Sequence, residues 1–92
     1  IRNRVMLNLT VLKNFLGSPG QPVHARVKVA AQNLAGQNRR IHTREIRDGI
    51  AIYYIGEFSV ANEETLKFTV QARPQGTQES VEVRFSQDFY TH

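Results

Sequence analysis

The chain has 92 residues, of which 40% are hydrophobic, a net charge of +4 and no cysteine. This length suits one domain spanning residues 1–92, and the lack of cysteine excludes disulfides, thiol catalysis and cysteine-ligated zinc. The longest unbroken apolar run, residues 50–55, is far shorter than the roughly 20 residues of a membrane-spanning helix, so no membrane span is expected.

A period of two in the apolar residues predicts β-strands along most of the chain. The first two predicted strands cover residues 5–12 and 23–31, and the turn-forming sequence GSPGQP separates them at residues 17–22. Their inward faces are expected to hold the alternate apolar residues Val5, Leu7, Leu9, Val11, Val23, Ala25, Val27, Val29 and Ala31.

The third and fourth predicted strands form a hairpin. Residues 39–46 and 50–60 are rich in β-formers, and Asp48-Gly49 between them is a strong signal for a two-residue turn. This turn would place the third-strand residues opposite fourth-strand residues in the pairs His42–Ile55, Arg44–Tyr53, Ile46–Ala51 and Arg47–Ile50. The fourth strand is expected to turn its even-numbered residues inward: Ile50, Ile52, Tyr54, Phe58 and Val60.

Two more strands, residues 65–72 and 81–86, complete the pattern, and the second of them extends toward Phe89. The polar connection at residues 61–65 is compatible with one helical turn capped by Asn62. Six strands separated by breakers predict an all-β fold, an immunoglobulin-like Greek-key β-sandwich of about six to seven antiparallel strands, with a small closed barrel as the alternative. Six residues are expected to be among the most buried: Leu9, Val27, Tyr54, Phe68, Val83 and Phe85.

Charge is distributed unevenly along the chain. Residues 1–47 hold nine Lys/Arg and one acid, a balance of +8, whereas residues 48–92 hold three Lys/Arg and seven acids, a balance of −4. Either strands from the two halves interleave and offset each other's charge, or the molecule presents a cationic surface to an anionic partner.

Five segments in this order resemble a bacterial family of exported proteins, domain of unknown function family 4426: MLNLTVL, QNLAGQ, REIRDGIAIYYIGEF, NEETLKFTV and VRFSQDFYT. The resemblance spans nearly the whole chain. Two other segments, GQPVHARVKV and YIGEF followed by LKFTV, are distantly similar to immunoglobulin-like and YtkA/FixH-like sandwich modules. The resemblance implies a periplasmic location in Gram-negative bacteria and a signal peptide and leading segment ahead of Ile1, both absent from this sequence. It implies no catalytic residues.

The residues themselves offer little chemistry. There is no Gly-x-Ser-x-Gly motif and no phosphate-binding glycine loop. The carboxylates of Glu45, Asp48 and Glu57 are expected near the hairpin, where ion pairing with Arg44 and Arg47 is the simplest interpretation. We therefore expect no enzymatic activity, no cofactor and no small-molecule substrate.

Metal binding has weak support in the sequence. His24, His42 and His92 stand far apart, and the chain has one methionine, so we expect no metal site, although a copper-handling carrier remains the alternative function. A nucleic-acid binder using Arg39, Arg40, Arg44 and Arg47 ranks last, because it needs a basic groove with stacking aromatic residues and an exported protein meets little nucleic acid. We therefore expect no nucleic-acid partner.

The hairpin supplies the predicted binding surface. With Ile52 and Tyr54 facing inward, the outward residues would be Ile46, Tyr53 and Ile55, with Arg44 and His42 beside them. Apolar patches rimmed by arginine mark protein interfaces. The alternative is that both faces of the hairpin are covered within the domain, or that the register differs by one residue. The sequence thus favours a non-catalytic periplasmic interaction or accessory module that binds a protein partner or a second copy of itself.

Overall fold

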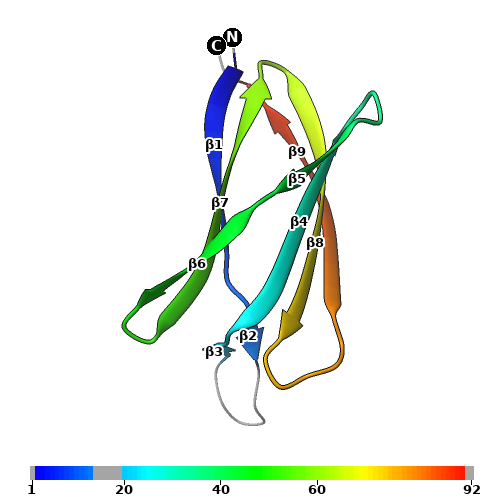
Figure 1. The fold of residues 1–92 in the computed structure, drawn as a ribbon. Coiled ribbons are helices and arrows are strands. Elements are labelled where there is room, and N and C mark those ends of the chain that lie inside the picture. The colour runs from blue at the N-terminus through cyan, green and yellow to red at the C-terminus, as the bar shows by residue number, and fades with distance from the viewer. Residues whose placement is uncertain (1, 14–19, 91–92) are drawn as a thin grey trace.

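The computed structural model describes residues 2–13 and 20–90, which fold as two antiparallel β-sheets packed face to face (Figure 1). In the described residues, one sheet has three strands in the order β1-β7-β6 and the other has four in the order β5-β4-β8-β9. The predicted all-β sandwich is therefore confirmed, and the seven strands of these two sheets agree with the expected six to seven. None of the described segments forms a helix with the length and hydropathy needed to cross a bilayer.

Each of the two sheets is built from strands that are separated along the chain. The three-stranded sheet consists of β1 (Arg2–Leu9), β6 (Thr43–Asp48) and β7 (Ala51–Ala61). The four-stranded sheet consists of β4 (Ala25–Asn33), β5 (Asn38–Ile41), β8 (Glu64–Pro74) and β9 (Val81–Phe89). Two short strands, β2 (Leu12–Lys13) and β3 (Gln21–Pro22), pair with each other at one end of the sandwich (Figure 1).

The core lies between the sheets, where alternate residues of β4, β7 and β8 point inward. Phe58 from one sheet meets Phe68 from the other edge to face, with ring centroids 5.5 Å apart, an arrangement that the ring quadrupoles favour. Tyr54 is also buried, as predicted, with 4% of its surface exposed. The buried cluster around the phenylalanines consists of Val29, Ala31, Ile41, Phe58, Val60, Leu66, Phe68 and Val70.

The last strand departs from the prediction. Val83 and Phe85 were expected in the core, but 52% and 38% of their surfaces are exposed. Both lie on the same side of their sheet as the core residues, since Phe85 pairs with Phe68 and Val83 with Val70. The sheet that faces them is one strand narrower and leaves Val83 and Phe85 partly uncovered, whereas Phe89 near the end of β9 still packs against Phe58. Alternation indicates the face that a residue occupies and does not show whether a second layer covers that face.

The predicted strand 39–46 is in fact two strands in different sheets, separated at His42. Ile41 ends β5 and points into the core opposite Val29, whereas Thr43 begins β6 and pairs with Gly56 of β7. A Cβ added at Gly56 would lie 2.8 Å from Cγ2 of Ile41 and 3.1 Å from the carbonyl oxygen of His42. Glycine therefore permits the crossing chain to lie directly against β7.

The hairpin turn lies one residue beyond its predicted position. Asp48 pairs with Ala51, so the two turn residues are Gly49 and Ile50. Gly49 has φ 61°, the left-handed conformation that a type II′ turn requires of its first central residue. Ile50 was expected to face inward but lies at the tip of the turn with 92% of its surface exposed.

The polar connection between β7 and β8 is a two-residue turn, so the helical turn considered for residues 61–65 is wrong. Asn62 and Glu63 form the turn, and Glu63 has φ 60°. The carboxylate of Glu64 accepts hydrogen bonds from the backbone N–H of Ala61 at 3.1 Å and from Nη2 of Arg39 at 3.3 Å. The bond from Ala61 of β7 joins the two sheets at this end, whereas the bond from Arg39 joins β5 and β8 within one sheet.

Candidate functional site

The predicted binding surface gathers on the outer face of the three-stranded sheet. Arg44 lies opposite Ile55, and Ile46 lies opposite Tyr53. The predicted partners were different, but the register differs by an even number of residues, so the same side chains share one face. His42 precedes β6 and lines a shallow concavity of about 360 Å³ together with Arg44 and Ile55.

Exposure on this face is moderate. Ile46, Tyr53 and Ile55 are half-buried, while Arg44 and His42 are exposed. We call these five residues the outer hairpin face.

Strand β1 adds residues beside the outer hairpin face that sequence reasoning missed. Met6 has 60% of its surface exposed and pairs with Glu57, whose carboxylate lies 2.9 Å from Nη2 of Arg4. The sequence held no signal for this neighbourhood, because the pairing of β1 with β7 joins residues that are far apart in the chain.

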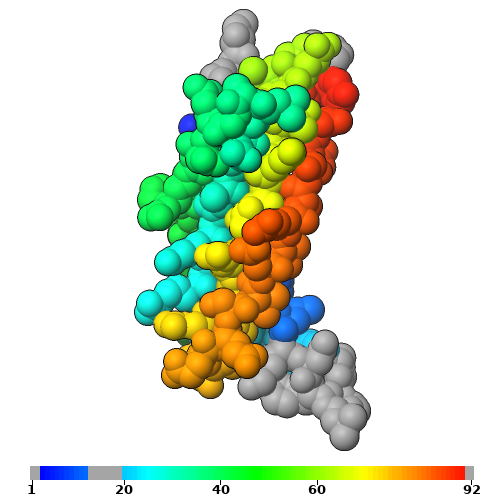
Figure 2. Space-filling view, turned by 90° about the vertical axis from the view of Figure 1, so that its right-hand side faces the viewer, coloured from blue at the N-terminus to red at the C-terminus, as the bar shows by residue number. Residues whose placement is uncertain are grey.

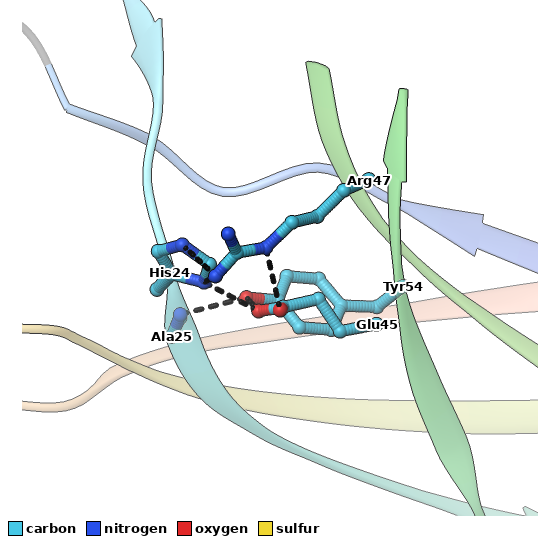
Figure 3. Close-up of polar contacts among 5 residues, drawn as sticks. All are labelled: His24, Ala25, Glu45, Arg47 and Tyr54. Carbon is cyan, nitrogen blue, oxygen red and sulfur yellow. Dashed lines mark hydrogen bonds and ion pairs between the residues drawn. The ribbon is translucent and has the colours of Figure 1, made fainter. Parts of the chain in front are cut away.

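A polar cluster bridges the two sheets near the C-terminal end of β6, away from His42 (Figure 3). Tyr54 of β7 donates its hydroxyl hydrogen to Oε1 of Glu45 at 3.1 Å and accepts from the backbone N–H of Ala25 at 2.7 Å. His24 Nδ1 lies 2.7 Å from the same carboxylate oxygen. Nε of Arg47 lies 3.5 Å from the other carboxylate oxygen, so the predicted ion pair between Arg47 and Glu45 is confirmed.

The contacts of His24 define its tautomer. Nη2 of Arg47 lies 2.7 Å from Nε2 of the imidazole. A guanidinium only donates hydrogen bonds, so Nε2 is the acceptor and Nδ1 carries the hydrogen that is donated to Glu45. A histidine that serves as a general base needs a free ring nitrogen. Here Arg47 occupies that nitrogen, and the imidazole serves as a bridge between Arg47 and Glu45.

The cluster perturbs two of its own groups. The hydrogen bond from His24 is the largest cause that lowers the pKa of Glu45, and the hydrogen bonds from Tyr54 and Arg47 act in the same direction against desolvation. Desolvation by burial is the largest cause that raises the pKa of Tyr54. Both shifts favour an ionised Glu45 and a protonated Tyr54, which are the states that the hydrogen bonds require. We call the cluster of His24, Ala25, Glu45, Arg47 and Tyr54 the clamp, because its contacts join the two sheets.

The described histidines do not form a metal centre. His24 is held in the clamp and His42 lies on the outer hairpin face, while His92 lies outside the described residues. In the part of the chain that the structure describes, no group of three or more His, Cys, Asp or Glu residues is placed to hold a metal ion.

An apolar groove opens along the side of the sandwich where β9 is the edge strand of the four-stranded sheet. Its volume is about 290 Å³. Leu12, Val81 and Val83 line it, and 52% or more of the surface of each is exposed. Among the described strands, β9 pairs with β8 alone, so the backbone N–H and C=O groups along its other edge have no strand partner. The lining of this β9 groove is Leu9, Thr10, Val11, Leu12, Val27, Val70, Ala72, Pro74, Val81, Val83 and Phe85.

Comparisons with known proteins concern the whole chain. The crystal structure of a DUF4426 family protein from Pseudomonas aeruginosa PAO1 superposes with a TM-score of 0.82 and 24% sequence identity, which shows a shared fold. The match covers 97% of this chain and 67% of that chain. No curated protein matches the sequence. The model of the DUF4426 family, described as a domain of unknown function, matches residues 1–92, and the protein therefore belongs to that family.

Proposed function

We propose that the domain is a non-catalytic interaction module of the bacterial periplasm that binds an extended segment of a partner protein along β9. The observation that carries the proposal is the coincidence of an unpaired strand edge with the apolar β9 groove. An added strand gains affinity from main-chain hydrogen bonds and specificity from pockets for its alternate side chains. The β9 groove offers both features.

The chemistry of the partner follows from the two faces of β9. Val81, Val83 and Phe85 point toward the β9 groove, so alternate residues of the added strand should be apolar and fill the space beside them. The opposite face of β9 carries Glu82 and Arg84, so the other residues of the partner should be polar. Natural proteins usually protect a strand edge of this kind with inward charges or a covering loop. The inward residues Val81, Val83 and Phe85 carry no charge, which supports use of this edge for binding.

The clamp supports a role without catalysis, since each of its polar groups is engaged in holding the sheets together. No observation favours copper handling over protein binding, because the described residues bring no three His, Cys, Asp or Glu side chains together to hold a metal ion. The outer hairpin face is the second surface through which such a module would contact protein. Its apolar residues are less exposed than Leu12, Val81 and Val83 of the β9 groove. The periplasmic location rests on the family resemblance and is tested by fractionation of cells that express the full-length protein.

The test uses a soluble, fluorescently labelled peptide of alternating valine and threonine, with lysine at each end, in an anisotropy titration. The wild-type domain should bind it, and Val83→Lys should weaken binding by about tenfold or more, because a charge then faces the apolar side chains of the added strand. Val83 is half exposed, so the variant should fold.

Two controls make the result specific. Met6→Lys places the same charge at an equally exposed apolar position on the other sheet and should leave affinity unchanged. A peptide of the same composition with its valines grouped together should bind weakly. An equal loss of peptide affinity in Val83→Lys and Met6→Lys would contradict the proposal. Sedimentation showing a dimer that Val83→Lys dissociates would assign the β9 edge to a second copy of the chain and would also contradict it.

A further inference from the structure

Two arginines face each other on the outer side of the four-stranded sheet. Arg26 on β4 lies directly opposite Arg73 on β8. Side chains in such a pair begin only about 5 Å apart, and like charges placed there destabilise a sheet. Neither guanidinium forms an ion pair with any carboxylate among the described residues. The pair therefore costs stability unless an anion from outside the described chain lies between the two side chains.

A small concavity lies at this arginine pair. Its volume is about 140 Å³, and its lining is Arg26, Lys28, Gln71, Arg73 and Ser80. Every one of these side chains carries a hydrogen-bond donor, and three of them are cations. No carboxylate lines the concavity. We infer that this concavity binds the phosphate group of an anionic ligand.

Two acidic side chains on neighbouring strands, Glu82 and Glu45, have other partners. Glu82, across from Gln71 on β9, accepts hydrogen bonds from Gln71 Nε2 at 3.1 Å and from Nε of Arg84 at 2.8 Å. Glu45 is held in the clamp. Neither carboxylate neutralises the arginine pair, so the positive charge remains available to a ligand. Arginine also suits a phosphate group geometrically, because its planar donors bind two oxygens at once.

A larger, shallower concavity adjoins the first and shares Arg26 and Arg73. Its volume is about 660 Å³, and its other walls are His24, Ala25, Arg47 and the turn at residues 74–77. It offers room for the organic part of a phosphate ester. Figure 2 faces this side of the molecule, where β5, β4, β8 and β9 lie side by side in green, cyan, yellow and orange-red. The site is separate from the β9 groove, which opens between the sheets.

The first experiment measures the melting temperature of the domain in increasing inorganic phosphate, with ionic strength held constant by sodium chloride. Phosphate should raise the melting temperature of the wild type with a saturating dose response, since a ligand that binds only the folded state stabilises it. Arg73→Gln should weaken the apparent affinity by about tenfold or more. The same variant should melt higher than the wild type without phosphate, because it relieves the repulsion from Arg26.

Arg40→Gln is the matched control. Arg40 is exposed on β5 of the same sheet, opposite Ala30, and does not line the concavity, so its loss removes the same charge from the same sheet. This variant should keep the phosphate response of the wild type. An equal loss of response in both variants, or a wild type that responds no more to phosphate than to chloride, would overturn the inference.

A second arm distinguishes the sources of the phosphate group. Vesicles of phosphatidylcholine with and without phosphatidic acid are sedimented with the wild type and with Arg73→Gln. Co-sedimentation that needs both phosphatidic acid and Arg73 assigns the site to a lipid headgroup. A response to inorganic phosphate without co-sedimentation assigns it to a soluble phosphate compound. Co-sedimentation that is equal for the two proteins would contradict a role for this concavity.

Discussion

The backbone N–H of Ala25 donates a 2.7 Å hydrogen bond to the hydroxyl oxygen of Tyr54, so one phenol joins β4 of one sheet to β7 of the other. The hydroxyl hydrogen continues to Glu45. Tyr54 itself is 4% exposed, which places this contact at the border between the apolar core and the clamp.

Tyr54→Phe tests the clamp by removing only the hydroxyl group. It leaves the N–H of Ala25 without its acceptor in a partly buried position, and the free energy of unfolding should fall by about 1–3 kcal/mol in urea denaturation. Tyr53→Phe is the control on the neighbouring residue. Tyr53 makes no hydrogen bond among the described residues, so its variant should stay within about 0.5 kcal/mol of the wild type. Equal effects would show that the hydroxyl of Tyr54 is not a clamp.

The lowered pKa of Glu45 predicts how stability depends on pH. The folded carboxyl binds its proton less readily than the unfolded one, so its contribution is fully present above the ordinary pKa of 4.5 and is lost as pH falls toward the lower folded value. Between about pH 6 and about pH 3, unfolding free energy should therefore fall less steeply in Glu45→Gln than in the wild type. Glu57→Gln, which removes an exposed ion pair with Arg4, should follow the wild-type curve. Matching slopes for wild type and Glu45→Gln would contradict the assignment.

Because the inward face of β9 is partly exposed, two stacked phenylalanines should contribute unequally to stability. Phe68 and Phe85 lie 4.9 Å apart between ring centroids, but Phe68 is 2% exposed and Phe85 is 38% exposed. Phe68→Ala should lower the unfolding free energy by about 3–5 kcal/mol, because it leaves a cavity in the core. Phe85→Ala should lower the unfolding free energy by clearly less than Phe68→Ala, because 38% of the surface of Phe85 is already exposed and its removal leaves no enclosed cavity. Similar losses in chemical denaturation would mean that the inward face of β9 is covered in solution.

The outer hairpin face is tested by the double variant Tyr53→Glu with Ile55→Lys. Both side chains point away from the core and are half-buried, so circular dichroism should show an intact fold. Affinity for the alternating peptide should be unchanged, because the β9 groove lies elsewhere. Loss of binding in a folded double variant would move the peptide site to the outer hairpin face.

The alternation of apolar residues predicted most of the fold. The strands around Val29, Phe58 and Phe68 and their inward faces were readable because a half-buried strand repeats every two residues. The break at His42 was not readable, because residues 39–46 hold only two apolar residues, Ile41 and Ile46, and so show no clear alternation. The partners of Ile41 and Thr43, which are Val29 and Gly56, belong to different sheets. Pairing across the chain is a tertiary property that a local pattern does not record.

The same reason explains what was found and missed of the candidate sites. The residues of the outer hairpin face are close in sequence, and a short turn brings them together, so local reasoning could find them even with the turn misplaced. The clamp joins His24 to residues on two other strands, and the arginine pair joins Arg26 to Arg73. For the arginine pair, the sequence offered the uneven charge of the chain as a signal. That charge left two interpretations open, which were offsetting strands and a cationic surface for an anionic partner.

The most direct test of the central claim is amide hydrogen exchange of β9, measured residue by residue with and without the alternating peptide. In the free domain, the amides of β9 that point away from β8 should exchange quickly, because no described strand accepts from them. The account predicts that the peptide slows exchange at these amides between Val81 and Gln87 and leaves β5 unaffected. Protection that appears along β5 or β6, with the β9 amides unchanged, would contradict the account.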